Sequence, residues 1–452
     1  MNLKRMQRIA LFWLLLCCGI SVLWGYFLER GSSIGELDFK GVYYDARCLL
    51  QHGDPYKEGE PLRVYQAEGG RLQPSLEGLW QVLKLDVYLP TTNILIAPFA
   101  MLPWKLALLL WMSLTVGTLV LAAFLMWNFG ASYAPVISGC LICFILANSE
   151  ILFASGNTAG VVVSLCVVAV WCFVRDRFVI AGILCLAISL AIKPHDAGFV
   201  WLYFLLAGGV CRKRALQTLL VTVALALFII LWLAPIAPHW MQEWQSNLSV
   251  ISAHGGINDP SPTSTSGRNG GMVIDLQSTI SAFRDDPRIY NPESYLVCGS
   301  LLLVWAVRAL RSRFSQRGAW LALAAAVPLT LLVTYHRPYD AKLLLLTVPA
   351  CAMLWREGRP IRWFALIVTA AGIISTSDIP LTILLVLTKD VHMPTAGWPG
   401  QLLTVLLTRP IPLILLTMGI FYLWIYLRHD PAQCYTGKSE GELMAPIAAK
   451  MA

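Results

Sequence analysis

The chain has 452 residues, of which 57% are hydrophobic and only 13% charged, and its mean hydropathy is +0.64. Soluble domains carry about 25% charged residues, so this composition excludes them and predicts a protein that crosses a membrane many times. The net charge of +8 does not indicate nucleic-acid binding. Lys and Arg lie in short turns between apolar segments, which is the pattern of membrane topology.

Apolar segments near the length of roughly 20 residues that a membrane-crossing helix needs recur along the chain. They predict an all-α polytopic membrane protein with about twelve transmembrane helices, between about 11 and 13. The segment 9–28 is too long for a cleavable signal and lacks its small-residue exit, so we expect it to remain as the first helix. The expected spans lie near 9–28, 104–127, 134–153, 157–174, 178–192, 196–210, 215–236, 293–309, 319–335, 341–355, 362–380 and 403–427.

Five basic segments predict the orientation, because all of them fall on the same side of a twelve-span chain. Positive charge favours the cytoplasmic side, so we expect both termini in the cytoplasm and the long loops on the outer face of the cell inner membrane. The basic segments are 1–8, 175–177, 211–214, 308–317 and 356–362.

Residues 1–428 are predicted to form a single integral membrane domain, followed by a short polar tail, 429–452. No clear internal repeat is present, whereas many secondary transporters have one. Two long outer loops are expected, 29–103 and 237–292, with the segment 381–402 on the same side.

The second loop has two parts. Trp240 and Trp244, four residues apart, predict a short helix at the membrane interface. The stretch 255–272 is rich in Gly, Ser, Thr, Pro and Asn and is expected to be flexible. It fits either a mobile loop over an outer-face site or a plain linker.

The first loop contains an amphipathic helix with clear boundaries. Asp38 is expected to cap its start and Gly53 to end it in a left-handed conformation. An apolar stripe with helical spacing predicts that one face lies along the outer membrane surface. The stripe consists of Phe39, Val42, Tyr43, Ala46, Leu49 and Leu50.

Two turns on the outer side each combine a cation, an imidazole and a carboxylate around a proline. Taken singly, each fits an ordinary polar turn, with Lys193 snorkelling and Asp196 or Asp340 capping a helix. Cations are normally depleted on this side, so two such turns together indicate an anionic ligand such as a lipid-linked phosphate. The residues are Lys193, His195 and Asp196 around Pro194, and His336, Arg337, Tyr339 and Asp340 around Pro338.

No metal site or cofactor is expected. Six of the seven histidines fall on the outer side, yet no two of them have a ligand spacing such as HxxxH. Cys140 and Cys143 form a CxxC within an apolar helix, without the further ligands that a zinc site needs.

An outer-face carboxylate near cationic turns suits the transfer of a sugar from a lipid phosphate. The carboxylate deprotonates the acceptor hydroxyl, and the phosphate leaves as an anion that needs positive charge and hydrogen-bond donors, not an acid. Asp38 is the candidate base. Asp45 is the nearest alternative and Asp86 the next.

Five segments resemble, in order, the motifs of family 87 of the GT-C class polyprenyl-phosphate-dependent glycosyltransferases, which include bacterial alpha-mannosyltransferases. The resemblance covers roughly 35–350, while the last 100 or so residues agree only as further spans. The segments are DFKGVYYDARCLLQHGDPY (38–56), YLPTTNILIAPFAMLPWKLALLLW (88–111), SGNTAGVVVSLCVV (155–168), RFVIAGILCLAISLAIKPH (177–195) and TYHRPYDAKLLLLTVPA (334–350).

The resemblance implies a GT-C fold in which Asp38 takes the place of the catalytic aspartate of the first loop. It places Lys193 and His336 near the lipid phosphate and sugar. His195, Arg337 and Asp340 are expected to complete this donor site, with Tyr43, Tyr44, Asp45 and Asp86 as possible substrate contacts. The chain departs from the family at His195 and Asp196, where Q-P or Y-P is common, and this leaves the donor sugar open.

The expected function is therefore inverting transfer of mannose or another hexose from a polyprenyl-phosphate donor to a lipid or glycan acceptor at the outer face, by a monomer. Two alternatives remain: a transporter or flippase of a lipid-linked sugar, and an oligosaccharide ligase or polymerase. The flippase would need ionisable residues at mid-bilayer, where the predicted spans contain almost none.

Overall fold

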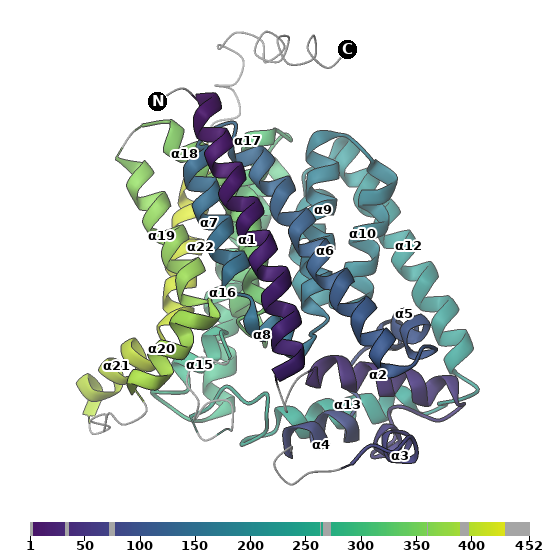
Figure 1. The fold of residues 1–452 in the computed structure, drawn as a ribbon. Helices are drawn as coiled ribbons and strands as arrows, with labels where there is room; N and C mark the ends of the chain where they lie inside the picture. Colours follow the sequence, from purple (N-terminus) through teal and green to yellow (C-terminus); the bar gives the residue numbers. More distant parts are fainter. Residues whose placement is uncertain are drawn as a thin grey trace.

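The computed structural model describes residues 3–31, 36–71, 77–262, 264, 273–358, 360–388 and 397–429, and all regular structure within these ranges is helical (Figure 1). The predicted tail lies outside the described residues except for His429. Residues 263 and 265–272 of the stretch expected to be flexible also lie outside them.

The helices fall into three groups by their length and by their place in the bundle or the outer loops. The longest are α1 (Leu3–Gly31), α6 (Trp104–Gly130), α12 (Gly209–Leu233), α16 (Pro287–Arg311), α17 (Gln316–Val333) and α22 (Pro410–Arg428). Those of intermediate length are α7 (Pro135–Ala147), α9 (Ala159–Arg175), α10 (Val179–Ile192), α11 (Pro194–Leu206), α18 (Val348–Arg356), α19 (Ile361–Ser375), α20 (Asp378–Thr388) and α21 (Gly397–Thr408). Helices in the outer loops and short connecting helices are α2 (Leu37–Leu50), α3 (Glu60–Ala67), α4 (Glu77–Lys84), α5 (Pro90–Ala100), α8 (Glu150–Ser155), α13 (Trp240–Ser252), α15 (Leu276–Ile280) and the 3-10 helix η2 (Asp340–Thr347).

Six helical segments in the described part of the chain are long and apolar enough to cross a membrane, which confirms a helical membrane protein. The expected number of twelve spans stays a prediction, because several expected spans are shorter helices. The segment expected at 341–355 is divided between η2 and α18. The six segments are Trp104–Gly130, Pro135–Ser155, Gly209–Leu233, Pro287–Arg311, Gln316–Val333 and Pro410–Arg428.

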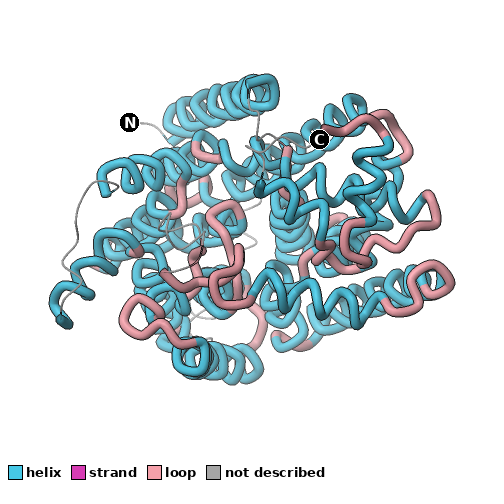
Figure 2. The backbone as a smooth tube through the Cα atoms, turned by 90° about the horizontal axis from the view of Figure 1, so that it is seen from below, coloured by secondary structure: helices cyan, strands magenta, loops and turns pink. Residues whose placement is uncertain are grey.

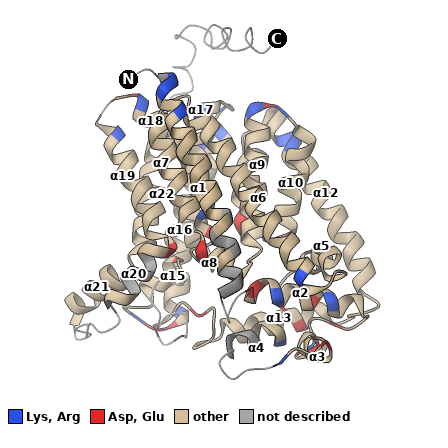
Figure 3. Ribbon diagram, viewed as in Figure 1, with Lys and Arg blue, Asp and Glu red and all other residues tan. Residues whose placement is uncertain are grey.

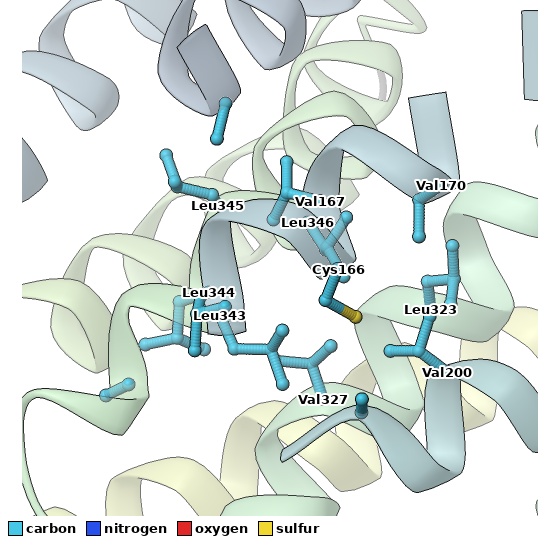
Figure 4. Packing of buried hydrophobic residues seen from close by; sticks show 14 of the residues in the cluster. Cys166, Val167, Val170, Val200, Leu323, Val327, Leu343, Leu344, Leu345 and Leu346 are labelled. Atoms are coloured by element: carbon cyan, nitrogen blue, oxygen red, sulfur yellow. The ribbon is translucent and has the colours of Figure 1, made fainter. Parts of the chain in front are cut away.

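Helix α17 lies at the centre of the bundle, and every residue from Gly318 to Leu332 is buried. It packs closely on α22, where a Cβ added to Gly419 would come within 2.7 Å of Leu329. Figure 4 shows Leu323 and Val327 of α17 with Cys166 and Val167 of α9 and with the leucines of η2. Small and branched side chains therefore hold η2, and the polar turn before it, against the core.

Charged residues are unevenly distributed along the bundle axis (Figure 3). Lys and Arg dominate the upper end, by the start of α1 and the ends of α9 and α18, whereas the opposite end carries both Asp and Glu and Lys and Arg. This agrees with the predicted segregation of the basic turns. The helices α2, α3, α4 and α13 gather at the lower end (Figure 1), and the view from below in Figure 2 shows helices joined by loops, with no strand among the described residues.

Helix α2 confirms the predicted apolar stripe but corrects both predicted boundaries. The stripe residues are buried except for the half-buried Leu50. The N-cap is Glu36, with φ 61°, and Asp38 lies inside the first turn. At the other end His52, not Gly53, has the left-handed conformation. Because α3, α4, α5 and α8 also cover α2, the helix is packed within the outer layer and does not lie exposed on it.

Asp45 and Asp86 are almost fully buried beneath this layer, each with 1% exposure. Asp86 accepts hydrogen bonds from Tyr88 N at 2.8 Å and Asn93 Nδ2 at 2.6 Å, whereas Asp45 Oδ1 has no hydrogen-bond partner among the described residues. Burial, followed by the charge of Asp86, raises the pKa of Asp45 well above its usual range. Burial also raises the pKa of Asp86 to about 7.

Replacing Asp45 with asparagine is expected to stabilise the protein at pH 8 more than at pH 5. An acid with a raised folded-state pKa binds more protons folded than unfolded, so its contribution to stability is lost as pH rises above its unfolded-state pKa toward the higher folded-state pKa. Asparagine cannot ionise, and we expect Tm to rise by at least about 2 °C at pH 8. Thermal unfolding of both proteins at the two pH values measures this, and an equal or larger gain at pH 5 would contradict it.

Candidate functional site

The first outer loop and the two polar turns meet at one place. Tyr88 lies near both the first loop and the first polar turn, as the pKa of its hydroxyl indicates. Burial and then the charge of Asp38 raise this pKa, while the charge of Lys193 lowers it. The charge of Asp38 also contributes to the raised pKa of Arg337, after burial, which lowers it, and the larger effects of Tyr335 and Tyr339. Asp38 therefore lies close enough to Arg337 to interact with its charge, and both Asp38 and Lys193 lie near Tyr88, although 150 or more residues separate Asp38 from either turn along the chain.

Asn157 fixes the carboxylate of Asp38. Asn157 Nδ2 donates a hydrogen bond to Asp38 Oδ2 at 2.8 Å, and Asn157 Oδ1 accepts one from Ala159 N at 2.8 Å. Because the backbone N–H of Ala159 can only donate, it determines which end of the Asn157 amide points toward Asp38. The start of α9 thus orients the candidate base and leaves Asp38 half-buried.

Aromatic packing holds the first turn of α2 in place. The ring of Phe39 stacks on Trp111 at 5.0 Å and on Trp104 at 5.6 Å between centroids. Gly156, with φ 63°, lies directly beside Phe39, since a Cβ on Gly156 would come 2.8 Å from Cβ of Phe39. This close approach requires glycine, and it brings the neighbouring Asn157 within reach of Asp38.

Lys193 and Asp340 link the two polar turns. Lys193 Nζ donates to Asp340 Oδ1 at 2.8 Å and lies 3.9 Å from Asp196 Oδ2. Although burial lowers the pKa of Lys193, the two carboxylates raise it above its usual value, so the amine stays charged. The second oxygen of Asp340 accepts a hydrogen bond from Arg337 N at 2.8 Å. Asp340 therefore organises its own turn and neutralises much of the charge of Lys193.

Arg337 differs from Lys193 in its partners. No ion pair found among the described residues involves its guanidinium. Its Nε donates to Tyr335 Oη, and the guanidinium carbon lies 5.6 Å from the centroid of the Tyr335 ring. Because Lys193 is already paired, Arg337 is the better candidate of the two for binding an anion.

The two histidines predicted for this site also come together. The rings of His195 and His336 are 5.1 Å apart between centroids, and both lie beside Asp196. His336 is fully buried, whereas the side chain of His195 is 37% exposed. Burial lowers the pKa of His195 to about 4 and leaves its imidazole neutral at neutral pH.

The predicted substrate contacts Tyr43, Tyr44, Asp45 and Asp86 are all buried within the outer layer. Tyr43 is 1% exposed and donates its hydroxyl to Leu102 O at 2.8 Å, and Tyr44 packs edge-on against it at 5.0 Å. Both tyrosines therefore lie in the packing of α2. Asp45 and Asp86 form the buried pair described above, and a substrate would have to displace the outer layer to reach them.

Sequence reasoning did not assign roles to several residues of the site. Asn157 stands in the quoted segment SGNTAG, and its position just before a helix is the signal that marks it. Tyr88 and Tyr335 were also not assigned, although each stands in a segment that resembles the family. Two further buried ionisable residues, Lys342 and Asp378, were also not assigned. Lys342 Nζ donates a hydrogen bond to Asn148 O, and Asp378 Oδ2 accepts one from Ile151 N at 2.7 Å.

Comparison with known proteins supports the resemblance drawn from the motifs. Residues 87–282 match the model of glycosyltransferase family 87, a range that includes Asn157, Lys193 and His195 but neither Asp38 nor His336. Searches of curated proteins and of solved structures found no significant match. The match over residues 87–282 therefore confirms, for that part of the chain, the resemblance to glycosyltransferase family 87 that the motifs predicted.

Proposed function

We propose that this protein transfers mannose or another hexose from a polyprenyl-phosphate donor to a lipid or glycan acceptor at the outer face of the cell inner membrane. The transfer inverts the anomeric carbon, and Asp38 is the general base. The protein acts as a monomer, and the reaction itself requires no cofactor, since the lipid-linked sugar is a substrate.

The observation that carries this proposal is the presence of both Asp38 and Arg337 at this site. Asp38 is a carboxylate oriented by Asn157 and left half-buried, and Arg337 is a nearby cation with no carboxylate ion pair among the described residues. A base and an anion-binding group are the two groups that this transfer needs. Lys193 supports Arg337 through Asp340, which binds the backbone N–H of Arg337.

The chemistry follows from these positions. The acceptor hydroxyl gives its proton to Asp38 while its oxygen attacks the anomeric carbon. The bond between that carbon and the phosphate oxygen breaks, and the lipid phosphate leaves as an anion stabilised by the guanidinium of Arg337. Because the acceptor attacks opposite the departing phosphate, one displacement inverts the configuration.

A panel of synthetic polyprenyl-phosphate sugars, incubated with membranes that contain the wild type or the Asp38→Ala variant, tests the proposal. We expect a glycosylated product from at least one donor, only with the wild type. Movement of a labelled lipid across vesicles, with no glycosidic product from any donor, would favour the flippase. Growth of a glycan chain or block transfer, in place of single-sugar additions, would favour the ligase or polymerase.

A further inference from the structure

His195, Asp196 and His336 converge on one point, although the sequence offers no metal-ligand spacing between the two histidines. His336 Nε2 lies 3.3 Å from Asp196 Oδ1, and His195 Nε2 lies 3.9 Å from the same oxygen. One ligand atom from each residue lies within 4.8 Å of the other two. Hydrogen bonding does not require two imidazoles to face one carboxylate oxygen.

Several polar atoms of this buried cluster have no hydrogen-bond partner among the described residues. Asp196 is fully buried, and neither of its carboxylate oxygens has a hydrogen-bond partner among the described residues. The same holds for Nε2 of the fully buried His336. Buried polar groups are nearly always satisfied, so Asp196 Oδ1 and His336 Nε2, which face each other at 3.3 Å, need a positive species between them.

The tautomer of His336 indicates what kind of group would fit between His336 and Asp196. His336 Nδ1 lies 2.8 Å from Thr334 O, and because a carbonyl only accepts, Nδ1 carries the hydrogen. In a neutral ring, Nε2 is then a lone pair that faces the lone pairs of Asp196. A positively charged species between them removes this repulsion. The backbone bond of Nδ1 is also the arrangement that orients a metal-binding histidine.

The formal charges nearby point the same way. The carboxylates of Asp196 and Asp340 both lie beside the cation of Lys193. Lys193 Nζ is 2.8 Å from Asp340 and 3.9 Å from Oδ2 of Asp196. The other oxygen of Asp196, Oδ1, is the one that approaches the two histidines. Oδ1 of Asp196 is therefore placed to bind a cation together with the two histidines.

We propose that His195, Asp196 and His336 bind a divalent transition-metal ion of the zinc class. Three atoms with these separations surround a common point at about 2.4 Å or less, within a few tenths of an ångström of the 2.0–2.2 Å that zinc prefers. Two nitrogens and one carboxylate oxygen suit such an ion, and three protein ligands leave a coordination position open. The half-exposed His195 gives the ion access from outside.

The bound ion would tie the start of α11 to the turn before η2. The proposal goes beyond the proposed sugar transfer and is tested separately from it, because binding of the ion is measured without a sugar donor. The expectation of no metal, drawn from the absence of an HxxxH spacing, considered only ligands close in sequence. Here 140 residues lie between the two histidines that approach Asp196, His195 and His336.

The test uses the purified full-length protein in detergent, stripped with a chelator and then titrated with Zn²⁺ by calorimetry and with Co²⁺ by visible absorption. We expect one ion per chain and a Tm at least about 2 °C higher at saturation. Asp196→Asn and His336→Gln should each weaken binding at least about 100-fold, beyond the 10- to 100-fold typical of groups outside the ligand shell. His239→Ala, which removes an exposed histidine elsewhere on the outer side, should leave binding unchanged.

If Asp196→Asn or His336→Gln fails to fold, His195→Ala replaces it, because His195 is partly exposed and its loss leaves no buried group newly unpaired. The wild-type Co²⁺ spectrum alone also decides the matter. Absence of a stoichiometric ion in the stripped and reloaded wild type overturns the proposal and assigns the cluster to a protonated His336 paired with Asp196. Equal loss of binding in His239→Ala also overturns it.

Discussion

Replacing Asp38 with asparagine is expected to lower the rate of sugar transfer about 1,000-fold, since a positioned general base contributes about 10²- to 10⁴-fold. Asparagine has nearly the same shape, and its side-chain oxygen can still accept the hydrogen bond from Asn157 Nδ2. The fold and donor binding should therefore survive while the proton acceptor is lost. Single-turnover transfer with the donor found in the panel measures the loss, and thermal unfolding checks the fold.

Glu36→Gln is the matched control for Asp38→Asn. Glu36 lies two residues earlier at the start of α2, and its carboxylate pairs with Lys40 at 3.8 Å. Removal of this charge should change transfer less than about threefold, because the Glu36 carboxylate is paired with Lys40 and takes no part in the proposed proton transfer. Full activity in Asp38→Asn would show that another group takes the proton, and Asp45→Asn and Asp86→Asn would then be assayed next.

Replacing Arg337 with glutamine is expected to lower transfer about 100- to 1,000-fold, the usual effect of removing one donor from a developing anion. The loss arises because the departing lipid phosphate no longer meets a guanidinium. Stability should change little, since no carboxylate among the ion pairs of the described residues depends on this side chain. Initial rates over a range of donor concentrations and thermal unfolding separate the two effects.

Two comparisons make the Arg337→Gln result specific. Arg288→Gln removes an exposed arginine near the start of α16 and should leave transfer intact. Lys193→Met should behave in the opposite way, with a loss of stability of about 3 to 5 kcal/mol, because it leaves Asp340 and Asp196 buried without their cation. If Arg337→Gln loses stability as much as Lys193→Met does, Arg337 is a structural residue and the anion-binding assignment fails.

The helix α2 shows how far local patterns reach. The apolar stripe from Phe39 to Leu49 was predicted correctly, because helical spacing of apolar residues is a local property. Both predicted ends were wrong. Asp38 has the residue type of an N-cap, but its side chain binds Asn157, and Glu36 takes the left-handed position before the helix. Tertiary contacts with α8 and α9 outweighed a capping preference of about 1 kcal/mol.

In the polar turns, the sequence identified the candidate residues but not their individual roles. Composition marked Lys193, His195, His336, Arg337 and Asp340 as candidates, because ionisable residues near a membrane are unfavourable without a purpose. It could not divide their roles. Only the structure shows that Asp340 binds Lys193, that Arg337 has no carboxylate partner among the described ion pairs, and that the two histidines share Asp196.

The sequence by itself determined that this is a helical membrane protein, that its basic turns share one side, and that its motifs resemble family 87. These follow from hydropathy, charge and short motifs, which are properties of neighbouring residues. The tertiary structure alone decided which distant residues meet. Asn157 reaches Asp38 across 119 positions and Lys193 reaches Asp340 across 147, and such contacts depend on how helices pack, which no local pattern records.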